Sequence, residues 1–179
     1  MTILNETNTR TDSLIDVAKK MMTAARTAPK GCGVDNLSIC LADRESIESI
    51  AQTMKEMVSK EEAPQFFARD ADNILASQAL VLIGTKVVPL GLSQCGLCGF
   101  ANCEEKNKYP STPCSFNTGD LGIAIGSAVS LASDNRVDNR IMFSVGKAVK
   151  KMNLMGEDVQ VIYGIPLSCS GKSPFFDRK

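Results

Sequence analysis

The sequence contains no histidine and no tryptophan. Without histidine, the chain can supply neither imidazole acid–base catalysis nor a histidine ligand to a metal. Aromatic residues make up only 5% of the chain, which argues against a surface that stacks the bases of single-stranded nucleic acid. Twenty basic residues balance twenty acidic ones, so no excess of positive charge indicates binding to nucleic acid or to anionic lipid.

Long hydrophobic segments are also absent. The longest apolar run lies around residues 78–84 and falls far short of the roughly 20 residues that a membrane-spanning helix needs. The N-terminal sequence MTILNETNTRTDS is polar and lacks the basic and then apolar pattern of an export signal. We therefore expect a cytoplasmic protein with no membrane partner and no nucleic-acid partner.

The composition of the chain is that of a globular protein. Its 179 residues, 44% of them hydrophobic, are enough to bury one core. We expect a flexible tail over residues 1–11 and a single domain over residues 12–179. Segments with helical and strand spacings of apolar residues alternate along the domain, and long connections between the strands favour crossovers over hairpins. The predicted fold class is α/β (α+β), with a mixed or parallel sheet flanked by helices.

Caps and helix-breaking residues set the boundaries of the predicted elements. Asp12 or Ser13 can cap the first helix, and Asp43 and Asp138 can cap two later ones. The run over 79–84 has the pattern of a strand buried on both faces. The predicted elements are helices over about 12–28, 43–59, 66–77, 118–132 and 138–156, and strands over 36–41, 79–84 and 159–163, the last followed by a turn-rich tail.

The strongest chemical signal lies in a segment at about 89–116, where glycine, cysteine, proline and asparagine replace any apolar periodicity. A loop of this length inside a compact domain usually has a function. Within it the spacing C-x2-C-x4-C-x10-C brings together four thiols that can ligate one metal centre, and these belong to Cys95, Cys98, Cys103 and Cys114.

Three interpretations of these four cysteines compete. Four thiolates suit a [4Fe–4S] or a [2Fe–2S] cluster, and Gly96 and Gly99 would leave backbone N–H groups free to point at cluster sulfides. A structural zinc ion is the alternative, although zinc sites usually consist of two separated C-x2-C pairs. Free or disulfide-linked cysteines are the third reading. We predict an iron–sulfur cluster, [4Fe–4S] by preference.

The other three cysteines carry weaker signals. Cys40 lies in an apolar strand and has the character of a small core residue. Cys32, between two glycines, and Cys169, in the turn-rich tail, are each interpreted as an ordinary loop cysteine, with a reactive thiol as the alternative. Among other polar residues Asp35, Asp120 and Tyr109 are conceivable acid–base groups, but no pair of them has a diagnostic spacing, so no catalytic residue is assigned.

Several segments resemble known families. CGLCGFANCEE is similar to the CGxCGxxxC motif of iron–sulfur modules in anaerobic redox complexes. AARTAPKGCGVDN resembles the helix and flavin-facing loop of the nitroreductase superfamily, DLGIAIGSAV resembles its central helix, and VIYGIPLSCSGKSPFFDRK resembles its final strand and turn. In combination the chain resembles a ferredoxin-domain-containing family of anaerobes, which would add a cysteine-rich cluster-binding insertion to a nitroreductase-like fold.

The resemblance implies an FMN site and a homodimer. The nitroreductase-like arginine strip that grips the FMN phosphate is missing, because only Arg10 precedes the first predicted helix. The small-faced helix Gly122–Ser130 would lie at the dimer interface, or else pack against the domain's own sheet. The candidate flavin-binding residues are Arg26, Lys30, Gly31, Gly33, Lys172 and Arg178.

The predicted function is an iron–sulfur redox protein that passes electrons to bound FMN, acting with a redox partner protein or a small-molecule electron acceptor. One alternative is a cluster-binding electron-transfer or assembly module without flavin or catalysis, which the missing arginine strip favours. The other is a zinc-stapled structural protein of the same fold. Whether the chain is an enzyme is left open by the sequence; an oxidoreductase is the candidate activity.

Overall fold

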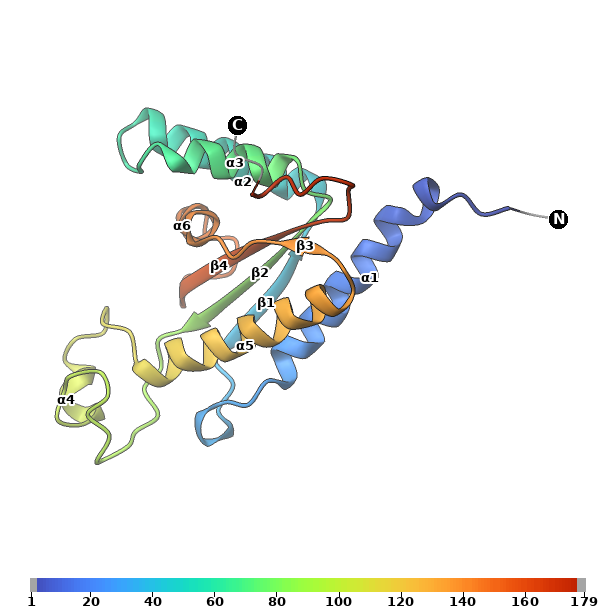
Figure 1. Cartoon of the computed structure of the whole chain (residues 1–179). Coiled ribbons are helices and arrows are strands. Elements are labelled where there is room, and N and C mark those ends of the chain that lie inside the picture. Colours follow the sequence, from blue (N-terminus) through green and yellow to red (C-terminus); the bar gives the residue numbers. More distant parts are fainter. Residues whose placement is uncertain (1–2, 177–179) are drawn as a thin grey trace.

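The computed structural model describes residues 3–176, in which helices cover both faces of a central sheet (Figure 1). The strands lie in the order β1-β2-β4-β3, and every neighbouring pair is antiparallel. Their bounds are β1 Leu37–Ala42, β2 Ala79–Lys86, β3 Asp138–Asn139 and β4 Val159–Ser168. Arg178, one of the predicted flavin contacts, lies outside the described residues.

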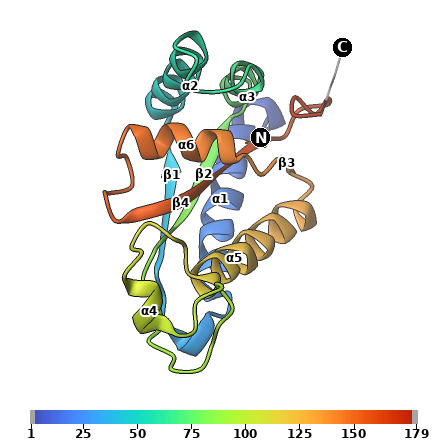
Figure 2. The same ribbon diagram turned by 90° about the vertical axis from the view of Figure 1, so that its left-hand side faces the viewer.

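The helices form two layers. α1 and α5 pack on one face of the sheet, and α2, α3 and α6 pack on the other (Figures 1 and 2). Their bounds are α1 Glu6–Thr27, α2 Arg44–Ser59, α3 Phe66–Leu75, α5 Ser115–Asp134 and α6 Phe143–Lys151, with the 3-10 turn η1 Gly31–Gly33 and the short helix α4 Cys103–Asn107 outside the layers. The result is a three-layer α/β arrangement, which confirms the predicted fold class.

The central strand β2 separates two hydrophobic cores. Val81 and Ile83 belong to the core shared with α1 and α5, whereas Leu80 and Leu82 belong to the core shared with α2, α3 and α6. Successive strand residues point to opposite faces, so a strand covered on both sides must be apolar throughout. The prediction that the run over 79–84 is buried on both faces is therefore confirmed.

Strand direction differs from the expectation of a mixed or parallel sheet. The connection from β1 to β2 is long, but it consists of two helices, α2 and α3, that pack together. Two helices carry the chain away from one end of the sheet and back to the same end. The next strand must then run antiparallel to the first, and a long connection alone does not imply a parallel pair.

Three predicted boundaries need correction. α1 begins at Glu6, where Asn5 caps it by accepting a hydrogen bond from Thr7 N–H, so residues 6–11 are helical and not a loose tail. Asp138 begins the short strand β3 and caps no helix; α6 starts at Phe143. β4 continues to Ser168, because its second half pairs with β2 and its last residues pair with β3.

The cysteine-rich segment projects from one end of the sheet. β2 ends at Lys86, α5 begins at Ser115, and the chain between them forms a loop that includes α4 (Figures 1 and 2). This placement puts the segment beside the N-terminal end of α5 and outside both cores. Neither hydrophobic core includes a residue of this segment.

Candidate metal centre

The four predicted ligand cysteines line one pocket. Cys95, Cys98, Cys103 and Cys114 all contribute to its wall, and its empty volume is about 330 Å3. Cys114 is the most buried of them, at 6% exposure, and lies at the N-cap position of α5. The structure thus brings to one pocket four cysteines that are up to 19 residues apart in the sequence. Two of them lie in the loop, one begins α4 and one is the N-cap residue of α5.

Backbone geometry shapes the part of the loop that carries Cys95 and Cys98. Gly96 and Gly99 have φ values of 69° and 86°, a left-handed conformation that glycine adopts without steric cost. The N–H of Gly99 donates to the carbonyl of Gly96 over 3.0 Å, which closes a tight turn around Cys98. These two glycines allow the tight turn that carries Cys98, directly after Cys95.

Side-chain caps hold the third cysteine in place. Cys103 is the first residue of α4, and the Oδ1 atom of Asn102 accepts a hydrogen bond from the N–H of Glu105. Glu105 in turn accepts a hydrogen bond from the N–H of Ala101 over 2.8 Å. This arrangement resembles a capping box, except that Glu105 binds the residue before the N-cap, and it orients the short helix without using any thiol.

The donor set fits a metal that prefers sulfur. All seven cysteines are free, so no disulfide competes for the four thiols at the pocket. Within residues 3–176 no group of three or more histidine, cysteine, aspartate or glutamate side chains is placed so that it could hold a metal ion as it stands. Ligation would therefore need the four thiols around the pocket to turn toward a common centre, which an irregular loop outside the cores allows.

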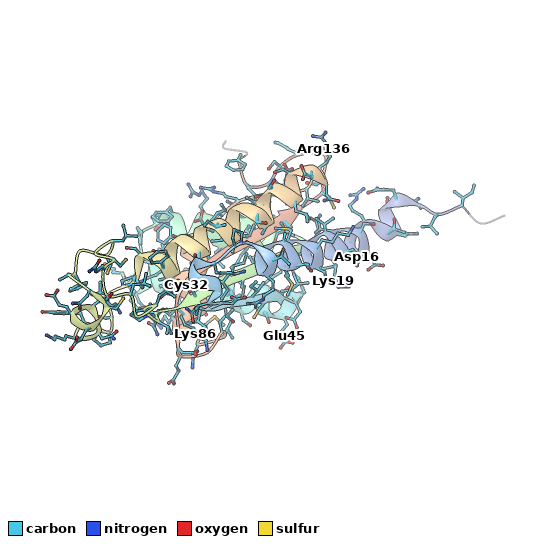
Figure 3. The ribbon with its side chains drawn as sticks, turned by 90° about the horizontal axis from the view of Figure 1, so that it is seen from below. Asp16, Lys19, Cys32, Glu45, Lys86 and Arg136 are labelled. Carbon is cyan, nitrogen blue, oxygen red and sulfur yellow. The ribbon has the colours of Figure 1, made fainter. Side chains whose placement is uncertain are left out.

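The remaining cysteines are separate from this pocket. Cys40 is half-buried in β1, where it packs against the core of α2, α3 and α6. Cys32 is exposed in η1 with a left-handed φ of 54° (Figure 3). Cys169 follows β4, where burial raises the pKa of its thiol despite the charge of Arg10. None of these three thiols lines the pocket of the four predicted ligands.

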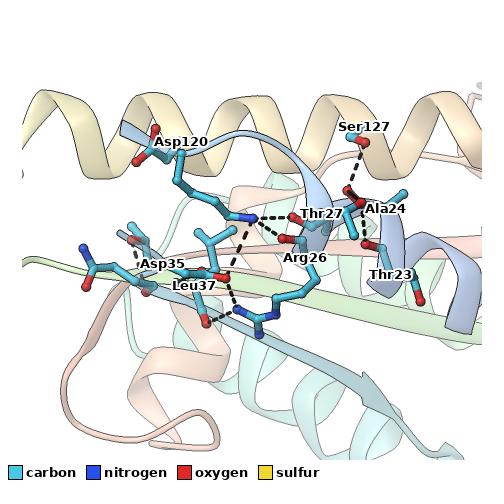
Figure 4. Close-up of polar contacts among 12 residues, drawn as sticks. Thr23, Ala24, Arg26, Thr27, Asp35, Leu37, Asp120 and Ser127 are labelled. Carbon is cyan, nitrogen blue, oxygen red and sulfur yellow. Dashed lines mark hydrogen bonds and ion pairs between the residues drawn. The ribbon is translucent and has the colours of Figure 1, made fainter. Parts of the chain in front are cut away.

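Two of the predicted flavin-binding cations have partners inside the domain. The Arg26 guanidinium donates to Asp35 over 2.7 Å and to the carbonyl of Leu37 over 3.1 Å (Figure 4). The Lys30 ammonium donates to the carbonyls of Ala25 and Arg26, and lies 3.8 Å from the Asp35 carboxylate. Both cations therefore lie against the Asp35 carboxylate, while Lys30 also binds carbonyls at the C-terminal end of α1 and Arg26 binds a carbonyl of β1.

The carboxylate of Asp35 connects α1 to β1. Burial by itself would raise its pKa, but the hydrogen bonds from Arg26 and from the N–H of Leu37 outweigh burial and lower it. A carboxyl with a lowered folded-state pKa stabilises the fold above its unfolded pKa of about 4, and this contribution is lost as the pH falls through the lower folded value.

We therefore expect Asp35→Asn to lower the melting temperature at pH 7, with the difference from the wild type shrinking as the pH falls below about 4. Thermal unfolding of both proteins between pH 7 and pH 3 measures this. Asp12→Asn, at an exposed position of α1, is the matched control and should change the melting temperature little at any pH. A difference that stays constant down to pH 3 would contradict the role of the Asp35 charge.

The η1 turn is held against α5 by polar and apolar contacts. The N–H of Gly31 donates to Oδ1 of Asp120 over 2.9 Å, and a Cβ atom at Gly31 would come within 2.6 Å of the Phe116 ring. Gly33 has a left-handed φ of 69°. Both predicted glycines are therefore required by the turn itself, and the predicted acid–base candidate Asp120 has a structural partner there.

Only part of the predicted flavin set is brought together. Arg26, Lys30, Gly31 and Gly33 cluster at the end of α1, near the start of β1. Lys172 follows β4 at the opposite end of the sheet, because Leu167 pairs with Ala79 while Leu37 pairs with Thr85. Tyr109, the third acid–base candidate, is exposed and stacks on Phe100 with ring centroids 5.2 Å apart.

A second, mainly apolar groove adjoins the cysteine pocket. Its empty volume is about 760 Å3, and it lies between η1, the first half of α5 and Leu97 of the cysteine loop. Ser115 and Phe116 line both spaces, so one wall separates them. Sequence reasoning missed Phe116. The only signal in the sequence was that Phe116 follows Cys114 by two residues. Nothing in the neighbouring sequence indicated that η1 would pack against the Phe116 ring.

Sequence comparison relates the whole chain to another protein. An uncharacterized protein of Archaeoglobus fulgidus is 40% identical over 183 residues, which cover 98% of this chain and 97% of that one. Residues 111–178 also match a family described as uncharacterized proteins containing a ferredoxin domain (DUF2148). The matched region includes Cys114 but not the other three predicted ligands, so the CGLCGFANC motif lies outside it.

Comparison with solved structures identifies the fold. A nitroreductase family protein from Clostridium novyi NT superposes with a TM-score of 0.62 at 15% identity, covering 98% of this chain and 79% of that one. Nitroreductase CinD from Lactococcus lactis, in complex with nicotinic acid, gives 0.60 at 13%, covering 98% and 86%. A BluB-like flavoprotein from Clostridium difficile 630 gives 0.57 at 19%, covering 88% and 84%.

These comparisons support a redox-related role on a nitroreductase-like fold. No helix within residues 3–176 combines the length and the apolar character that crossing a membrane requires. The 40% identity extends over nearly the full length of both proteins, and the family match covers the C-terminal part of this chain. The chain therefore belongs to the family of uncharacterized proteins containing a ferredoxin domain.

Proposed function

We propose that this protein is an iron–sulfur redox protein whose cluster, of the [4Fe–4S] type, is held by Cys95, Cys98, Cys103 and Cys114. The observation that carries the proposal is that these four cysteines line one pocket at the end of the sheet. Thiolates are the usual ligands of such clusters, and the pocket lies outside both hydrophobic cores. The cluster would supply one-electron steps.

An electron acceptor would bind in the groove that shares Ser115 and Phe116 with the cysteine pocket. Shared lining residues would place an acceptor next to the cluster, and the apolar lining of the groove suits a flat ring system. FMN or another small-molecule acceptor is the proposed occupant. Because solved flavoproteins share the fold, FMN is the first candidate to assay.

A second candidate function has its own support. Arg26 and Lys30 already bind Asp35 and backbone carbonyls, so neither is free to bind a phosphate without breaking these contacts. A phosphate group normally needs several charge-assisted donors. This engagement favours an electron-transfer or assembly module that carries a cluster and no flavin.

One purification distinguishes these functions. The protein is purified without oxygen and assayed for iron, acid-labile sulfide, zinc and extracted flavin, together with an absorbance spectrum. Iron and sulfide near four per chain, with FMN, support the flavin–cluster redox protein. The same cluster without FMN supports the electron-transfer or assembly module. Zinc alone, without iron, overturns the redox proposal in favour of a zinc-stapled structural protein.

A homodimer formed through α5 is part of the proposal. The predicted small face of this helix divides in two: Ala124 and Ala128 are buried within the domain, whereas Gly122 and Gly126 are exposed with open space around them. Exposed glycines allow a second helix to approach closely. We expect Gly126→Leu to convert a dimer to a monomer, measured by light scattering after gel filtration. A dimer that persists unchanged would exclude this face as the interface.

A further inference from the structure

The wall of the cysteine pocket contains a buried lysine. Lys106 lines the same pocket as the four cysteines and is 2% exposed, which places it among the most buried large side chains of the domain. It lies three residues after Cys103 in α4, so both side chains project from the same side of this short helix. The position of a cation beside the thiols is thus determined by the helix.

No anion within residues 3–176 compensates this charge. The Lys106 side chain forms no hydrogen bond and no ion pair with any described residue. The neighbouring carboxylates of Glu104 and Glu105 are exposed, and Glu105 accepts its hydrogen bond from the N–H of Ala101. Lysines whose side chains are covered to this extent are almost always paired, so an anion at the pocket would be the natural partner of Lys106.

We infer that Lys106 is the counter-charge of the cluster and raises its reduction potential, an inference that rests on the proposed cluster site. A cluster and its four thiolates carry a net negative charge, and one electron taken up from a reductant adds another. A positive charge in the pocket wall stabilises the more negative, reduced state more than the oxidised one. No bond to Lys106 forms or breaks, and its proton stays on Nζ.

The experiment compares Lys106→Met with Lys108→Met in the anaerobically purified holoprotein. Both variants remove one positive charge at the end of α4, but Lys108 is exposed, so water and salt screen its charge. A redox titration with dithionite, monitored by absorbance and by electron paramagnetic resonance, gives the reduction potential of the cluster in each protein. We expect Lys106→Met to lower the equilibrium constant for reduction of the cluster at least about tenfold, which is a fall of about 59 mV in the one-electron reduction potential. Lys108→Met should change this potential much less.

Equal potentials for the Lys106→Met and Lys108→Met proteins, each with full iron and sulfide, would overturn the inference. If Lys106→Met assembles no cluster, Co2+ is titrated into the metal-free proteins and the thiolate–cobalt absorbance is followed. The inference then requires that metal-free Lys106→Met binds Co2+ at least about tenfold more weakly than metal-free Lys108→Met does, and equal binding by the two variants overturns it. A wild-type protein without iron or sulfide would contradict the proposed function instead, which keeps the two failures distinct.

Discussion

Replacing Cys98 by serine should remove the cluster. Cys98 lies in the tight turn between Gly96 and Gly99, and its thiol lines the pocket that the other three proposed ligands share. An alcohol oxygen is a far harder ligand than a thiolate and stays protonated near neutral pH, so it binds cluster iron poorly. Anaerobically purified Cys98→Ser should therefore lose the brown chromophore, with iron and acid-labile sulfide reduced to a small fraction of the wild-type content.

Cys40→Ser is the matched control. It makes the same chemical change in β1, where the side chain packs against the core and not against the pocket. This variant should keep its iron and sulfide, although a hydroxyl in a half-buried position lowers the stability of the fold. If Cys98→Ser retains full iron and sulfide, the ligand assignment is wrong. If both variants lose the cluster equally, the loss reports general damage and not ligation.

The second large effect is expected at Gly146, in the middle of α6. A Cβ atom at this position would lie 1.7 Å from the carbonyl oxygen of Ile162 and 2.4 Å from its carbon, distances that backbone atoms cannot accommodate without moving. The helix would have to separate from β4, exposing residues such as Val145 that are fully buried between them. We expect Gly146→Ala to lower the free energy of unfolding by about 3 kcal/mol or more.

Helix propensity alone predicts that Gly146→Ala would stabilise the protein. Alanine in place of glycine within a helix is favourable by about 1 kcal/mol when packing plays no part. Gly171→Ala, in an exposed loop with no atom within 4 Å of the added Cβ, should stay within about 0.5 kcal/mol of the wild type. Urea unfolding followed by circular dichroism measures both. A Gly146→Ala protein as stable as Gly171→Ala would contradict the close approach of α6 to β4.

Much of the fold could be predicted from local sequence. Asp43 caps α2 as expected, accepting a hydrogen bond from the N–H of Ser46, and the apolar positions Ile47, Ile50 and Met54 are buried at helical spacing. The continuous apolar run of β2 follows from its position as a strand covered on both faces. These features depend on caps and on periodicity over a few residues, so a single sequence is sufficient to identify them.

The grouping of the four cysteines was also a local prediction. The spacing C-x2-C-x4-C keeps three thiols within one loop, and Pro113 precedes the fourth. The sequence did not show what surrounds them. Phe116 forms a wall between two spaces only because η1, more than 80 residues earlier, closes over it through Gly31. Contacts of this kind depend on segments that are distant in the chain.

Charged residues show the same division most clearly. In the sequence Arg26 and Lys30 are cations that could bind a phosphate, whereas in the fold both lie against Asp35 and backbone carbonyls. Lys106 is indistinguishable in the sequence from exposed Lys108, yet it is buried at the cysteine pocket. Residue type and spacing are local properties, but burial and ion pairing are decided by which distant segments pack together, so only the tertiary structure determines whether a charge is solvated, paired or in need of a ligand.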